Sequence, residues 1–238
     1  MFAALTRGTL DGMPASKTAR ERARAELTRE IKDEARRQLA EVGAHGLSLR
    51  AVARELGMVS SALYRYFPSR DHLLTELIID AYNEVGEAAE RADAPSAPPR
   101  DRWLRIWTGT RDWAKRNPHE YALIYGSPVP GYRAPQDTIT PAGRVPRALL
   151  RVMEAADLAP ASPGPPLSGE LAEQARRIQA ALDTSLSEAD LLRLVTAWTH
   201  LFGAISFELF GQYARTADPA DAYFAYSAGQ FADLVGLP

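Results

Sequence analysis

Residues 46–74 decide the fold, and they read GLSLRAVARELGMVSSALYRYFPSRDHLL. Ser48 can cap a first short helix, predicted from Leu49 to Leu56, because its side-chain oxygen can accept a hydrogen bond from a free backbone N–H. Gly57 ends this helix, since glycine readily adopts the positive φ that a tight turn requires. The pattern therefore predicts a short helix followed by a sharp turn.

A second short helix follows the turn. Ser60 or Ser61 can cap its start. It must end near Phe67, because Pro68 disfavours helical geometry in the residue before it. The two predicted helices are thus separated by only a few residues.

The packing of these two helices predicts a helix-turn-helix. Two helices that cross steeply need a small residue at their contact, which Ala53 supplies, and Leu63 can pack the second helix onto the first. The spacing of Ala53, Gly57 and Leu63 is typical of the arrangement whose second helix enters the major groove of DNA. The alternative is a plain helical hairpin.

Helices are also predicted on both sides of this pair. The apolar stripe of Leu27, Ile31, Ala35, Leu39 and Val42 indicates a helix before it, ended by Gly43 and Gly46. Ser69 can cap a long fourth helix from Asp71 to Arg91. We expect a flexible basic arm over 1–24, a helix-turn-helix domain over 25–70, and a second domain over 71–238.

The second domain is also predicted to be helical. A linker over 92–99 precedes helices expected at 102–115, 118–125, 144–156, 169–182, 187–213 and 220–235. Two loops rich in Pro and Gly, 127–141 and 159–168, separate them. No alternating strand pattern competes, so the fold class is all-α.

Charge is unevenly distributed along the chain. The first 70 residues carry 13 Lys and Arg against 8 Asp and Glu, whereas the remainder carries 15 against 22. A basic block attracts polyanions through counterion release, which suggests a nucleic-acid-binding head on a different body. Uneven surface charge alone is the other interpretation.

Other classes of protein find little support. The 238 residues contain no cysteine, and no stretch of about 20 residues is free of charge, so we expect a cytoplasmic protein that does not span a membrane. The four histidines lack metal-ligand spacing, and neither a nucleophile elbow nor a phosphate-binding glycine loop occurs. We expect no metal, no cofactor and no enzymatic activity.

Residues 27–77 resemble the DNA-binding head of the TetR family of repressors, in its AcrR-like branch. The most specific piece is LYRYFPSRDHLL, residues 63–74, because the family typically ends its recognition helix in aromatic and basic residues before a capped fourth helix. The resemblance implies an operator with two-fold symmetry, a homodimer, and a body that binds a small-molecule effector.

Side-chain chemistry suggests how this head contacts DNA. Arg65 can bond guanine O6 and N7 with both arms of its guanidinium and is the best candidate for reading bases. The hydroxyls of Tyr64 and Tyr66 suit phosphate oxygens, although Tyr66 fits a core position equally well. The remaining candidates lie at helix starts, where small or basic groups meet bases or phosphates: Ser48, Arg50, Ser60, Ser61, Ala62 and Arg70.

The body contains an aromatic set suited to a small hydrophobic ligand. Its candidate ligand-binding residues are Trp103, Trp107, Tyr121, Tyr125, Trp198 and Phe202; ordinary core is the alternative. Residues 117–135 and 197–211 also resemble the WHG-type C-terminal subtype of the family. Trp198 and Gly203 match its pattern, whereas Phe202 stands where a His is expected, which implies a less polar effector.

Both the homodimer and the effector-binding body have an alternative interpretation. The long helix over 187–213 is apolar on several sides, which favours a homodimer, although the core of a monomer would also explain it. A constitutive DNA-binding regulator without a sensor would account for the head and treat the body aromatics as core.

Overall fold

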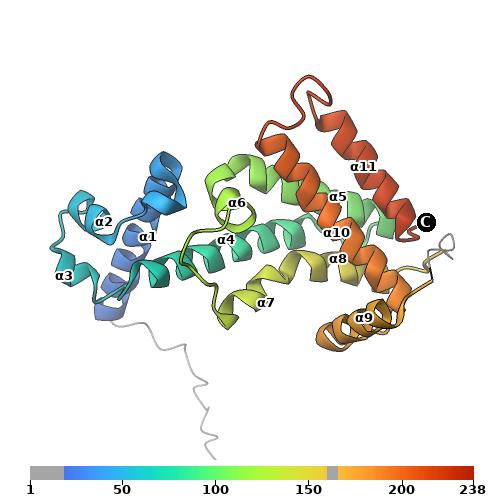
Figure 1. Ribbon diagram of the computed structural model, residues 1–238, viewed down its shortest axis with the longest axis horizontal. Helices are drawn as coiled ribbons and strands as arrows, with labels where there is room; N and C mark the ends of the chain where they lie inside the picture. The colour runs from blue at the N-terminus through green and yellow to red at the C-terminus, as the bar shows by residue number, and fades with distance from the viewer. Residues whose placement is uncertain (1–18, 160–165) are drawn as a thin grey trace, which may run out of the picture.

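The computed structural model describes residues 19–159 and 166–238. These residues form helices joined by turns and contain no strand, so the predicted all-α class is confirmed. Figure 1 shows α1, α2 and α3 gathered at one end as a head, while the helices from α5 onward form a larger body at the other end. The helix α4 runs from the head into the body and joins them.

The first helix is longer than the sequence predicts. α1 spans Ala19–Gly46, so residues 19–24, expected in a flexible arm, form its first turns instead. This part of the prediction is wrong, because helix formation needs no apolar stripe where Arg and Ala favour the helix intrinsically. Residues 1–18 of the expected arm lie outside the described residues. At the other end, Gly43 breaks the helix geometry with a φ of 68°.

The helix-turn-helix pair follows, with α2 at Leu49–Glu55 and α3 at Ser60–Leu63. Ser48 caps α2 as predicted, since its side chain accepts a hydrogen bond from the Ala51 N–H. No side chain caps α3, whose N-cap residue is Val59, so the expected cap by Ser60 or Ser61 is wrong. α3 is also shorter than predicted.

The other helices lie close to their predicted places. Ser69 caps α4 by accepting a hydrogen bond from the His72 N–H, as expected. The bounds are α4 Arg70–Ala92, α5 Pro99–Arg116, α6 Pro118–Tyr125, α8 Arg144–Glu154, α9 Gly169–Leu182, α10 Glu188–Leu209 and α11 Asp221–Leu234. Within the predicted loop over 127–141, the chain adds the 3₁₀ turn η1 Gln136–Thr138 and begins the short helix α7 Ile139–Ala142.

Two hydrophobic cores meet along α4. Its first part contributes Leu73, Leu74 and Leu77 to the core of the head. Its later part contributes Val85, Ala88 and other small residues to the core of the body. Each of the three leucines is almost completely buried, which stabilises its contact by roughly 1.5–3 kcal/mol. One helix therefore belongs to both cores.

Ion pairs also hold α1 against α4. The Lys32 ammonium lies 2.9 Å from a Glu76 carboxylate oxygen and 3.1 Å from one of Asp80. The Arg36 guanidinium lies 2.8 Å from the same Asp80 carboxylate. Both cations are largely buried, so solvent screens these pairs less than it screens exposed ones.

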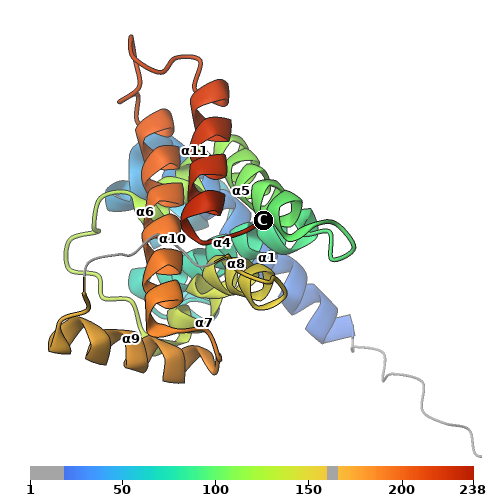
Figure 2. The same ribbon diagram turned by 90° about the vertical axis from the view of Figure 1, so that its right-hand side faces the viewer.

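Another ion network, in which Arg111 and Glu208 are largely buried, joins α5, α10 and α11. Arg111 donates from two nitrogens to the Glu208 carboxylate, each at 2.6 Å, and the terminal one of these two nitrogens also lies 2.8 Å from Asp221. Burial alone would raise the pKa of Glu208, but hydrogen bonds from Arg111 and Lys115 lower it overall. The helices α10 and α11, which this network links to α5, lie side by side at the end of the body (Figure 2). In the described ranges, no helix is both long enough and apolar enough to span a membrane.

Candidate nucleic-acid interface and ligand cavity

A glycine turn sets the angle between α2 and α3. Gly57 has a φ of 64°, as predicted. Its N–H donates to the Arg54 carbonyl at 3.1 Å, and the Met58 N–H donates to the Ala53 carbonyl at 2.8 Å. These two bonds form a Schellman motif, which satisfies carbonyls that the end of a helix otherwise leaves free.

The two residues predicted at the contact between α2 and α3 lie in one core. Ala53 and Leu63 are both buried, with 1% and 0% of their surfaces exposed, and both belong to the head core. After Leu63 the chain continues in helical turns, because the Tyr66 and Phe67 N–H groups both donate to the Leu63 carbonyl. We call residues 60–66, which include α3 and these turns, the recognition segment.

The recognition segment presents its polar side chains to solvent. Tyr64 is 42% exposed, and Arg65 is also exposed. Ser61 is exposed, while Ser60 and Ala62 are partly exposed. An outward face of this kind is accessible to a DNA groove.

Tyr66, for which the sequence allows either a phosphate contact or a core position, is partly exposed and partly packed. It is half-buried against the head core, and the guanidinium of Arg24 lies 5.3 Å from the centre of its ring. Its ring thus packs against the head core and also receives a cation–π contact from Arg24 of α1. Sequence reasoning placed Arg24 in the arm and missed this contact.

A shallow depression on the head collects four of the candidate DNA contacts. It has a volume of about 420 Å³, and its lining includes Ser48, Arg50, Tyr64 and Arg70. These residues come from the starts of α2 and α4 and from the recognition segment. The structure therefore brings together residues that lie up to 22 positions apart in the sequence.

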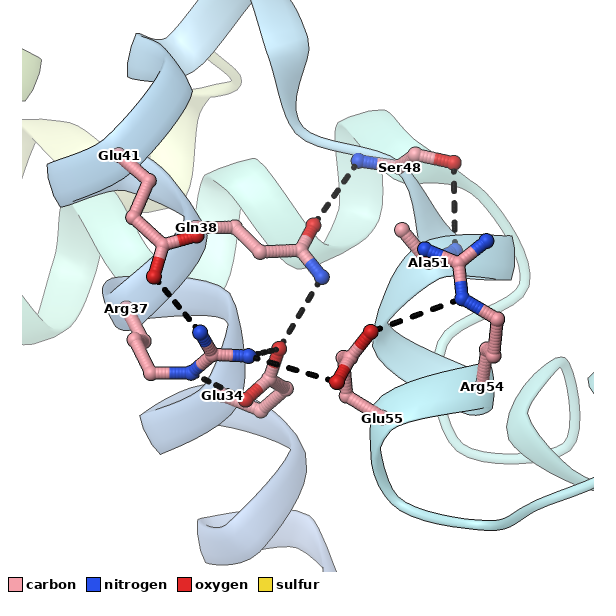
Figure 3. A network of polar contacts seen from close by, with 8 residues as sticks. All are labelled: Glu34, Arg37, Gln38, Glu41, Ser48, Ala51, Arg54 and Glu55. Atoms are coloured by element: carbon pink, nitrogen blue, oxygen red, sulfur yellow. Dashed lines mark hydrogen bonds and ion pairs between the residues drawn. The ribbon is translucent and has the colours of Figure 1, made fainter.

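Figure 3 shows how Ser48 is held at this depression. The Ser48 N–H donates to the side-chain oxygen of Gln38, whose own amide group donates to Glu34. The Ser48 hydroxyl oxygen accepts the Ala51 N–H, so the hydroxyl proton stays available to an acceptor such as a phosphate. A buried glutamine on α1 thus positions the start of α2.

Arg70 has a mainly internal position. Its Nε donates to the Leu47 carbonyl at 3.1 Å, and one terminal nitrogen donates to the Ala44 carbonyl at 2.6 Å. The other terminal nitrogen lies 3.7 Å from Asp71. Arg70 therefore ties the start of α4 to the end of α1 and to the connection before α2, and its other terminal nitrogen, with only the Asp71 carboxylate nearby, can also donate to an outside acceptor.

A cavity of about 590 Å³ lies in the body beside α4. Every side chain that lines it is uncharged. The lining comes from α4, α6, the segment after it, α7, α8 and α10, and includes Ile78, Tyr82, Ile124, Tyr132, Thr138, Ile139, Pro146 and Trp198. Such a lining suits a neutral, mainly apolar molecule.

Two hydrogen-bonding groups at the cavity wall are unused. The Tyr82 hydroxyl makes no hydrogen bond within the described part of the chain, and burial raises its pKa, with a further rise from Tyr132. The phenol therefore keeps its proton at neutral pH. The indole N–H of Trp198 is buried and also has no partner among the described residues.

The predicted aromatic residues are distributed differently from expectation. Of the six, Trp198 lines this cavity, and Tyr125 lines a second one between α1, α6 and α10. Trp103, Trp107, Tyr121 and Phe202 are packed in the body core and line neither cavity. Trp103 donates to the Ala228 carbonyl and Tyr121 to that of Phe202, and burial raises the pKa of Tyr121 to about 12.

Sequence reasoning missed most of the cavity wall. Tyr132 and Ile139 come from a segment predicted to be a loop, which folds back over α4. The available signal was the VPGY sequence at 129–132, a turn that places an aromatic residue at its end.

This head and body define a helix-turn-helix DNA-binding transcriptional regulator. Residues 31–77 match the family described as bacterial regulatory proteins, tetR family, and residues 103–231 match the family described as tetracyclin repressor-like, C-terminal domain. The chain belongs to the TetR family, which confirms the resemblance seen in its sequence.

Named relatives agree with this assignment. The chain is 40% identical over 204 residues to the HTH-type transcriptional regulator Rv1816 of Mycobacterium tuberculosis, with 80% of this chain and 84% of the relative covered. The same figures hold for the HTH-type transcriptional regulator Mb1846 of Mycobacterium bovis.

Solved structures show a similar fold. A crystal structure of the regulatory protein SCO4313 is similar with a TM-score of 0.75 and 33% identity, covering 90% of this chain and 98% of that one. A protein of unknown function from Rhodococcus sp. RHA1 shares the fold at a TM-score of 0.62 and 21% identity, with 92% and 97% covered.

The positive φ at Gly57 leads to a prediction for stability. Nothing lies within 4 Å of a Cβ placed there, so a substitution is penalised by backbone strain alone. Gly57→Ala should lower the free energy of unfolding by about 1–2 kcal/mol, measured by urea denaturation. Gly57→Asn should lose less, because asparagine tolerates the left-handed region. Equal stability of Gly57→Ala and the unchanged chain would contradict this view of the turn.

Proposed function

We propose that the chain is a repressor that binds a two-fold symmetric operator as a homodimer and leaves it when a small, uncharged, mainly apolar effector fills the cavity beside α4. The observation that carries the DNA-binding part is the wedge of Ala53 and Leu63, which turns Tyr64 and Arg65 outward. The protein would act in the cytoplasm, where bacterial DNA is located.

DNA contact divides between reading bases and holding phosphates. Arg65 reads a guanine in the major groove, and Ser60, Ser61 and Ala62 approach base edges near the start of the recognition segment. The depression on the head, with Ser48, Arg50 and Tyr64, takes the phosphate backbone, to which Tyr66 and the spare nitrogen of Arg70 add weaker contacts.

Loss of the Arg65 guanidinium should weaken specific DNA binding. The operator is first selected from a random DNA pool with the full chain, and affinity is then measured by fluorescence anisotropy. Arg65→Ala should reduce affinity by about fivefold to 150-fold, because a bidentate contact to guanine contributes roughly 1–3 kcal/mol.

The matched control for Arg65→Ala removes the same charge elsewhere. Arg91 is an exposed arginine near the end of α4 remote from the head, and Arg91→Ala should leave affinity unchanged. Selection of DNA without two-fold symmetry, or equal affinity of Arg65→Ala and the unchanged chain, would count against the proposal.

The effector class follows from the chemistry of the cavity. Its lining has no charged side chain, so a charged ligand would lose its hydration without gaining a partner. The unused Tyr82 hydroxyl and the unpaired Trp198 N–H offer donors to an acceptor oxygen on an otherwise apolar molecule. We infer a neutral effector with a hydrogen-bond acceptor.

Release from DNA would follow from the position of α4. Ile78 and Tyr82 line the cavity, and they lie about one and two helical turns beyond Leu74, which is in the head core. The two recognition segments of a dimer must lie about 34 Å apart to reach successive major grooves, so a small tilt of α4 would disturb binding. Coupling is reciprocal, so the effector must bind the free dimer more tightly than the DNA-bound one.

Filling the cavity with a side chain should prevent binding of a neutral probe. Nile red is uncharged, and its fluorescence rises in apolar surroundings. The full chain should bind it, and Ala142→Phe, which places a ring in the cavity, should reduce its affinity at least tenfold. Ala180→Phe on an exposed part of α9 is the matched control and should bind like the unchanged chain. Equal binding by both variants would favour the constitutive regulator without a sensor.

The dimer would form through α10 and α11. Large apolar side chains on these helices remain exposed, including Phe207, Tyr223, Tyr226 and Leu234. Figure 2 shows the two helices side by side at the end of the body away from the head. A two-fold pairing of this face would bury the exposed rings and match a symmetric operator.

A charge on this face should separate the subunits. Tyr226 is 64% exposed, and a two-fold axis near it would place two copies of the residue on one interface. Tyr226→Glu should shift the mass in light scattering after size exclusion toward 26 kDa, whereas Leu171→Glu, an exposed apolar position on α9, should leave a dimer. A 26 kDa mass for the unchanged chain at micromolar concentration would exclude this dimer.

A further inference from the structure

We propose that the hydrogen bond between Tyr132 and Thr75 is the contact through which the cavity controls the head, and that the effector acts by competing for the Tyr132 proton. The inference rests on the function proposed above and names the residue that detects the effector. Tyr132 is a positioning residue in this account, since it would influence DNA only through α4.

A rigid turn presents Tyr132 to α4. The Tyr132 N–H donates to the Val129 carbonyl at 3.1 Å, and Gly131 has a φ of 78°. With Pro130 before the glycine, this is the pattern of a type II turn, which proline and glycine both favour. The ring of Tyr132 is therefore held by its backbone as well as by its contacts.

Tyr132 contacts both the cavity and the head core. It forms part of the cavity lining, and it also packs against the head core together with Leu123 and Val129. Among the cavity-lining residues, these three make the direct contact with the head core. A molecule that shifts Tyr132 within the cavity would thus shift a side chain that the head packs against.

The direction of the hydrogen bond follows from counting protons. The Thr75 hydroxyl lies 2.9 Å from the Asp71 carbonyl, to which it donates, and 2.9 Å from the Tyr132 hydroxyl. A threonine hydroxyl has one proton, so Tyr132 must be the donor in the second bond. A ligand that carries an acceptor oxygen can compete for that proton.

The hydrogen bond between Tyr132 and Thr75, which we call the tether, lies at the DNA-proximal end of α4. Asp71 and Thr75 lie in its first two turns, next to Arg70, which bonds the carbonyls of Ala44 and Leu47. The Ala44 carbonyl lies near the end of α1, and the Leu47 carbonyl lies in the connection that leads into Ser48 and α2. Hydrogen bonds and the short backbone stretches between them therefore connect the cavity wall to the depression on the head.

The experiment removes the tether from either side in the full chain. Tyr132→Phe and Thr75→Val each delete one hydroxyl, and Thr75→Ser keeps it. Hydrogen exchange of the amides over 73–76 should become about threefold to tenfold faster in the first two variants, which is the usual net effect of one hydrogen bond, and should be unchanged in Thr75→Ser. Tyr213→Phe removes a hydroxyl with no hydrogen bond in the described residues and is the matched control.

Measuring operator affinity distinguishes a tether that controls DNA binding from one that only stabilises the fold. On the selected operator, Tyr132→Phe and Thr75→Val should weaken affinity to a similar extent, about threefold to tenfold, and the double variant should lose no more than either single one. Faster exchange with unchanged DNA affinity would overturn the inference. So would additive losses in the double variant, which would show that the two hydroxyls act separately.

The outcome for Arg65→Ala tells the two proposals apart. If Arg65→Ala weakens operator binding while the tether variants match the unchanged chain in both measurements, the inference fails and the proposed repressor remains. If Arg65→Ala has no effect on DNA, the proposed function fails, and the inference that depends on it fails with it.

Discussion

The structure depends on the shared burial of α4 in two cores. Leu73, Leu74 and Leu77 are fixed in the head, whereas Val85 and Ala88 are fixed in the body, and they lie on one continuous helix. The backbone hydrogen bonds of a continuous helix make it stiff, so a shift of one half is passed on to the other. Movement of the body around α4 must therefore reach the head, or be resisted by it.

Polar contacts make this coupling stiffer at both ends. In the head, Lys32 and Arg36 bind the carboxylates of α4, so α1 moves with it. In the body, Gly86 lets α8 approach closely, since a Cβ there would lie 2.6 Å from that of Arg144, and Arg144 pairs with Glu90. The cavity lies beside Ile78 and Tyr82 of α4, and every side chain that lines it is uncharged, so a neutral ligand there displaces no ion pair.

The sequence was sufficient for the parts whose geometry is local. Ser48, Gly57 and Ser69 each act within four residues of their own position, so their roles could be predicted from spacing alone. The recognition segment was harder, because a helix that ends at Leu63 and continues as turns has the same apolar pattern as a longer helix.

The cavity could not be predicted in the same way, because its wall depends on how a segment without apolar periodicity folds over α4. Large aromatics such as Trp103 and Trp107 marked the body as apolar, but an aromatic pattern cannot distinguish a packed core from the lining of a cavity. Tyr82 and Tyr132 line the cavity because α4 and the 129–132 turn approach each other in space, a contact between residues 50 positions apart. The same limit applies to Arg70, whose internal bonds could not be read from its place at a helix start.

Native-state hydrogen exchange along α4 tests the shared helix most directly. In Val85→Ala, which removes apolar contacts in the body core alone, the amides over 73–77 and those over 85–89 should lose protection by the same factor. Loss of protection over 85–89 with unchanged protection over 73–77 would show that the two halves of α4 open independently and that α4 does not couple the two cores.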